Sequence, residues 1–123
     1  VGLCGQIIEQ VEANPELQSQ MDELIAQGAD AGAVTRALLQ AGFPLSAVVN
    51  QVIAAFGAAD REMVESVVEA AVFETQQFGV HFIRSGAACA GADMAAVNQA
   101  IRVGLANMPG VNQTTGDPAS PKE

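Results

Sequence analysis

The residues of this chain best suited to chemistry are one histidine, two cysteines and a series of carboxylates. His81 is the only histidine, so a histidine metal cage or a paired-imidazole site would need a second copy of the chain. A cysteine nucleophile would need His81 as its base and a third group to orient it. A disulfide between Cys4 and Cys89 would remove both thiols, so we predict no cysteine catalysis.

The carboxylates do not form the pattern that acid–base catalysis requires. Glu62, Glu65 and Glu69 are spaced to lie on one face of a helix, but such catalysis uses two carboxyl groups in different environments, one of them usually desolvated. These three are expected to be equally solvated. The chain also has no calcium loop, no Gly-rich phosphate loop and no Cys-x-x-Cys pair. We therefore predict a protein that is not an enzyme, with no catalytic, cofactor-binding or metal-binding residues.

The two cysteines indicate the compartment. An even cysteine count in a small chain fits a disulfide in an exported protein, whereas two buried thiols are the alternative for a cytosolic protein. The sequence starts Val1-Gly2-Leu3 without an initiator Met, and we expect that a leader has been removed. We predict a disulfide between Cys4 and Cys89 and a secreted or periplasmic location.

Composition and charge exclude two kinds of partner. The formal net charge of -9 repels phosphate backbones, and the few basic residues are scattered, so no nucleic-acid binding is expected. The run from Ala37 to Ala59 has no charge and is about as long as a bilayer span. Gln40, Pro44 and Asn50 interrupt it, so we predict two core helices there and no transmembrane span.

Apolar residues recur at the helical period along most of the chain, separated by capping and breaking residues. Helices are expected to begin at caps or prolines and to end at glycines, with a Gly/Ala-rich loop at Ser85–Ala92 that carries Cys89. The prediction is an all-α chain, a compact bundle or short solenoid of about six helices stapled by the disulfide. Residues 1–110 form the helical domain, and residues 111–123 form a polar tail that is disordered unless a partner holds it.

The phenylalanines in the second half of the chain suggest an interaction surface. Phe73, Phe78 and Phe82 do not all share the Val64/Val68 stripe, so some are expected to face outward beside His81 and to dock a partner. With 50% hydrophobic and only 15% charged residues, the surface favours contact. We predict a structural or interaction protein that self-associates as an oligomer or filament subunit, or binds another protein. The alternative is a small helical carrier of an apolar ligand such as a lipid.

Overall fold

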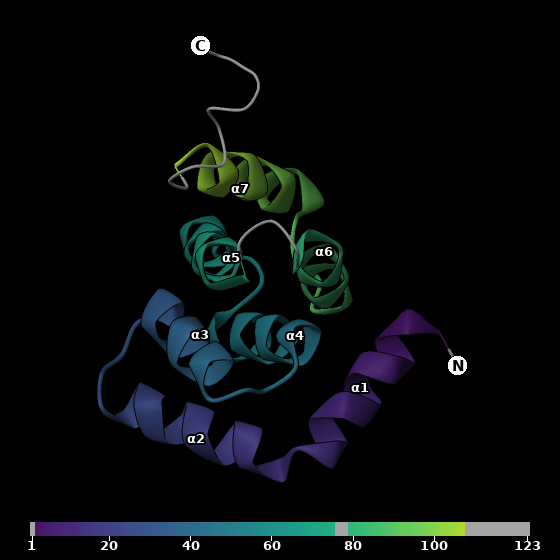
Figure 1. Cartoon of the computed structure of the whole chain (residues 1–123), viewed down its shortest axis with the longest axis vertical. Helices are drawn as coiled ribbons and strands as arrows, with labels where there is room; N and C mark the ends of the chain where they lie inside the picture. Colours follow the sequence, from purple (N-terminus) through teal and green to yellow (C-terminus); the bar gives the residue numbers. More distant parts are fainter. Residues whose placement is uncertain (1, 76–78, 108–123) are drawn as a thin grey trace.

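The computed structural model describes residues 2–75 and 79–107, and these fold into seven helices and no strand (Figure 1). The all-α prediction is confirmed, with one helix more than expected. Residues 111–123, the predicted tail, lie outside the described residues. The helices are α1 (Leu3–Ala13), α2 (Pro15–Ala26), α3 (Ala31–Gln40), α4 (Leu45–Phe56), α5 (Arg61–Thr75), α6 (Val80–Cys89) and α7 (Met94–Ala106).

Short polar side chains start several helices. The Asp30 carboxylate accepts a hydrogen bond of 2.8 Å from the backbone N–H of Ala33 at the start of α3, and Asp93 accepts one of 3.0 Å from Ala95 at the start of α7. Each bond satisfies a backbone donor that has no partner inside the helix. Asn14 precedes α2, but its side chain does not cap that helix. Its Nδ2 donates backward to the Gln10 carbonyl in α1 at 2.8 Å.

The core lies where α4 and α5 meet the surrounding helices, near the middle of the molecule (Figure 1). Its side chains are mostly valine and alanine, which are small enough for the helix axes to pack closely. Those with no solvent exposure include Ala47, Val48, Val49, Val52 and Ile53 of α4 and Val67, Val68, Ala71 and Val72 of α5. The described part of the chain is therefore one helical bundle around a shared apolar interior.

The predicted loop at Ser85–Ala92 is wrong over Ser85–Cys89, which belong to α6, and right over Ala90–Ala92, which connect α6 to α7. Gly86 explains the difference: a Cβ added there would lie 2.5 Å from the carbonyl oxygen of Ser46 in α4. The small residues of this segment serve the close approach of two helices. Cys89 is thus held at a helix end, where it bonds to Cys4 of α1 with the two Cα atoms 5.5 Å apart. The predicted disulfide is confirmed.

The uncharged run from Ala37 to Ala59 is divided between two core helices, as predicted. α3 ends at Gln40, and α4 begins at Leu45. Within residues 2–75 and 79–107, every helix is too short or too polar to cross a bilayer.

Candidate functional site

Phe82 and His81, two residues of the predicted interface, lie together on the surface at the start of α6. The Phe82 side chain is 52% exposed, and His81 is exposed beside it. The ring centroids are 5.5 Å apart, with the planes at 70° in an edge-to-face arrangement. This is a favourable geometry for two aromatic rings, so the pair presents a defined aromatic surface.

Phe82 lies on the face of α6 that carries Cys89, and a second exposed apolar side chain lies on the face of α1 that carries Cys4. Phe82 precedes Cys89 by seven residues, about two helical turns, so both lie on the same face of α6. On α1, Ile8 follows Cys4 by one turn and is 56% exposed. The bridge joins these two faces. We call the surface formed by Ile8, Phe82 and the Cys4–Cys89 bridge the α1–α6 edge.

Phe73 is exposed on α5, a helix that does not contribute to this edge. The Thr75 hydroxyl faces Gly79, since a Cβ at Gly79 would be 2.8 Å from Thr75 Oγ1. Phe73, two residues earlier, therefore points from the opposite side of α5, and its side chain is 58% exposed. Phe78, the remaining predicted contact, lies outside the described residues.

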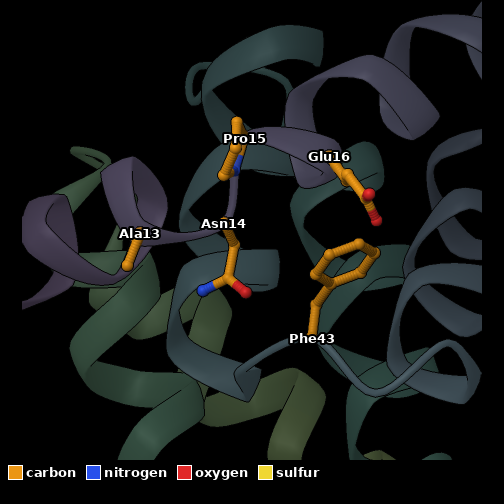
Figure 2. Close-up of a pocket in the computed structure, with 5 residues that line it drawn as sticks. All are labelled: Ala13, Asn14, Pro15, Glu16 and Phe43. Atoms are coloured by element: carbon orange, nitrogen blue, oxygen red, sulfur yellow. The ribbon is translucent and has the colours of Figure 1, made fainter.

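A second surface feature lies at the corner between α1 and α2. A pocket of about 240 Å³ opens there, lined by Ala13, Asn14, Pro15, Glu16 and Phe43. Figure 2 shows the Phe43 ring on one side, with the Glu16 carboxylate directed toward it and the Asn14 amide beside it, its oxygen on the side of the ring. None of these residues belonged to the predicted interface. The pocket joins residues far apart in the sequence, and the helix break at Asn14-Pro15 was the only local signal for it.

The titratable residues show no catalytic arrangement among residues 2–75 and 79–107. No group of three or more His, Cys, Asp or Glu side chains in this part of the chain is placed to hold a metal ion. Glu65 forms an i,i+4 ion pair with Arg61 at 3.3 Å, on the solvent side of α5. Such exposed pairs contribute little to stability. Glu62 is exposed, and Glu65 and Glu69 are partly exposed, so none of the three is withdrawn from solvent.

Comparison of the chain with protein-family models, with curated proteins and with solved structures found no match. The α1–α6 edge and the pocket are the two surface features of the described residues that suggest a function.

Ile8 is the member of the edge that sequence reasoning missed. Its spacing from Cys4, Ile7 and Val11 is that of one apolar helical stripe, yet only Ile7 of these is buried, at 2% exposure. The four-residue spacing of Ile8 from Cys4 indicates an outward position only once the structure shows that Cys4 is exposed. A residue on the same face as a surface cysteine shares its exposure.

Proposed function

We propose that this chain is a non-enzymatic interaction protein that associates with copies of itself through the α1–α6 edge. The observation that carries the proposal is the exposure of two large apolar side chains, Ile8 and Phe82, on the two faces that one disulfide joins. Covering them removes apolar surface from water, and the same edge on a second copy offers a matching surface.

The size of this surface sets the strength of association. Full burial of a large apolar side chain contributes ~1.5–3 kcal/mol, so covering the exposed halves of Ile8 and Phe82 on two copies contributes ~3–6 kcal/mol. Association itself costs ~4–15 kcal/mol in lost freedom. The two ranges overlap only at ~4–6 kcal/mol, so the edge alone supports at most a weak complex that depends on concentration and needs further contacts to become stable. Phe73, exposed on α5, offers a further contact through which copies could extend an oligomer.

The proposal includes a secreted or periplasmic location. The Cys4–Cys89 bridge supports it, because disulfides persist mainly in oxidising compartments. Ellman titration of the protein unfolded directly from cell fractions, without reductant, tests this part. We expect no free thiol in the extracytoplasmic fraction, and two free thiols per chain would contradict it.

The mass of the oxidised protein in solution tests self-association. Light scattering across a concentration series should give a mass that rises above the 12.6 kDa of one chain. Phe82→Ser and Ile8→Ser each remove an exposed apolar side chain from the edge without changing the net charge. In each variant, the average mass should begin to increase only at a higher protein concentration than in the unmodified chain. A mass that stays at one chain at every concentration contradicts the proposal.

Ile25→Ser is the matched control, because Ile25 on α2 is also exposed, at 36%, and lies outside the edge. Its mass curve should follow that of the unmodified chain. If Ile25→Ser weakens association as much as Ile8→Ser does, the edge is not the contact surface.

A further inference from the structure

We propose that the pocket at the α1–α2 corner is a binding site for a guanidinium or alkylammonium group. Its lining offers such a cation an aromatic ring from Phe43, a carboxylate from Glu16 and an amide oxygen from Asn14. This inference does not rest on the proposed self-association, because the pocket uses neither Ile8 nor Phe82.

The polar groups of the pocket are acceptors. The Asn14 Nδ2 is used in its 2.8 Å hydrogen bond to the Gln10 carbonyl, and Figure 2 shows the other end of that amide, its oxygen, on the Phe43 side. Within the described part of the chain, the Glu16 carboxylate has neither an ion-pair partner nor a hydrogen-bond donor. An unpaired carboxylate beside a free amide oxygen favours a ligand that donates hydrogen bonds.

The Phe43 ring adds an attraction that is specific for cations. The ring is half-buried and packs against the core, so its position is fixed while it lines the pocket. A cation held over an aromatic face is attracted by the negative charge of that face. The C-terminal end of α1 and the N-terminal end of α2 meet at Asn14, where their opposite partial charges offset each other. The Glu16 charge therefore decides the sign of the site.

The N-terminal segment that supplies most of the pocket has a one-sided charge. No lysine or arginine precedes Arg36 in the sequence, whereas this segment holds six carboxylates: Glu9, Glu12, Glu16, Asp22, Glu23 and Asp30. Such a one-sided distribution raises the local concentration of cations. The volume of about 240 Å³ is below the ~300–1,000 Å³ of pockets for drug-sized ligands. The site thus fits a group of side-chain size and is too small for a lipid.

A free organic cation and an arginine side chain of another molecule share this chemistry. Three described arginines have partners: Arg61 bonds to Glu65, Arg84 to Asn98 and Arg102 to Gln99. Arg36 is exposed on α3 and makes no hydrogen bond or ion pair to another described residue. Arg36 of a second copy is therefore the guanidinium that this protein itself can offer to the pocket.

The test is an NMR titration of the full oxidised chain with methylguanidinium, at a protein concentration where it is monomeric. N-methylurea, which has a similar shape but no charge, is the control probe. We expect the Phe43 ring and the Asn14 side-chain amide to shift and saturate with methylguanidinium only. Equal affinity for N-methylurea, or no saturable shift with either probe, overturns the proposal. Because the chain is monomeric in this titration, a lack of methylguanidinium binding would not contradict the proposed self-association. A lack of self-association would likewise not contradict the cation site.

Variants separate the two attractions. Glu16→Gln removes the charge, and Phe43→Leu removes the aromatic face while keeping an apolar side chain. Each should weaken methylguanidinium binding about two- to fivefold. Glu23→Gln makes the same charge change two helical turns further along α2, outside the pocket lining. Its affinity for methylguanidinium should stay within twofold of that of the unmodified chain. An equal loss in Glu23→Gln and Glu16→Gln overturns the site and indicates general charge attraction.

Arg36→Gln identifies the source of the cation. If Arg36 of a second copy occupies the pocket, methylguanidinium binds the unmodified chain more weakly as protein concentration rises, whereas Arg36→Gln shows no such loss. If the two proteins titrate alike at every concentration, a free cation is the ligand. Both results support the pocket as a cation site.

Discussion

At the scale of single residues, Gly86 determines how closely α6 and α4 approach. A Cβ at Gly86 would lie 2.5 Å from the Ser46 carbonyl oxygen and 3.2 Å from the Val49 Cβ, and neither atom can move without shifting α4. Gly32 in α3 is a contrasting case. Its added Cβ would meet the Ser66 hydroxyl at 2.8 Å, but Ser66 is exposed and can rotate away.

We predict that Gly86→Ala destabilises the protein by about 1–3 kcal/mol, because overpacking at a fixed backbone contact exceeds the gain in helix propensity. Gly32→Ala should instead leave the free energy of unfolding unchanged or raise it by up to ~1 kcal/mol. Urea unfolding of both variants measures the difference. An equal loss in the two variants would mean that the α4–α6 contact is not as tight as described.

At the scale of elements, α1 depends on its covalent connection more than the other helices do. Ile7 is its fully buried side chain, while Ile8 and the Cys4 end are exposed to solvent. Among the described residues, α1 is also joined to α4 by a 3.1 Å hydrogen bond that the Ser46 hydroxyl donates to the Gln10 side chain. The disulfide spans 85 residues, and closing a loop of that length stabilises the folded chain by roughly 4–5 kcal/mol in the chain-entropy treatment.

Replacing both cysteines by serine should therefore lower the free energy of unfolding by up to about 4–5 kcal/mol. Hydrogen–deuterium exchange should show the loss of protection to be greatest in α1. Reduction of the unmodified chain is the matched treatment and should reproduce both effects. A double variant as stable as the oxidised chain, with α1 equally protected, would contradict the anchoring role of the bridge.

The start of α3 depends on a single cap. Asp30→Ala removes the acceptor of the 2.8 Å bond from Ala33 and should destabilise the chain by about 1 kcal/mol. Asp30→Asn keeps a side-chain oxygen and should retain most of the stability. Thermal unfolding of the pair checks this. If Asn is as damaging as Ala, the charge of Asp30 rather than its cap bond stabilises the helix start.

The helices were predictable from the sequence where the signals were local. Asp30, Pro44 and Asp93 precede helices, because caps and prolines act on their own helix. The segment around Gly86 was misread as a loop, since small residues suit both a turn and a close helix contact. Only its partner, the Ser46 carbonyl, distinguishes the two, and that residue lies 40 positions away in sequence.

The candidate site was predictable only in part, for the same reason. Phe73 and Phe82 are both exposed, in agreement with the sequence argument that the phenylalanines do not all share the helical spacing of Val64 and Val68. Ile8 kept the helical spacing of a core residue, yet α1 lies at the margin of the bundle and buries only a narrow face. The pocket combines Asn14 and Glu16 with Phe43, a pairing that arises from how α2 packs on the end of α3.

At the scale of the whole molecule, charge opposes the proposed association. Each chain has a formal net charge of -9, so two copies repel each other over a Debye length of ~10 Å at 0.1 M salt, which falls to ~3 Å at 1 M. The apolar contact at the α1–α6 edge does not weaken with salt. The balance between the two should therefore shift with ionic strength.

We predict that self-association strengthens as salt is raised. Sedimentation velocity at low and high sodium chloride, with equal protein concentrations, should show larger species at high salt. Phe82→Ser should reduce the growth in size at high salt, because it removes part of the apolar contact surface while leaving the net charge unchanged. Association that weakens with salt would point instead to ion pairs as the main attraction.

The most direct test of the central claim is an NMR dilution series that follows the Ile8 methyl groups and the Phe82 ring. These signals should shift or broaden progressively as concentration rises, while those of Ile25, exposed on α2, stay constant. If Ile8 and Phe82 do not respond while the mass of the protein increases, the copies meet through another surface and the role assigned to the α1–α6 edge is wrong.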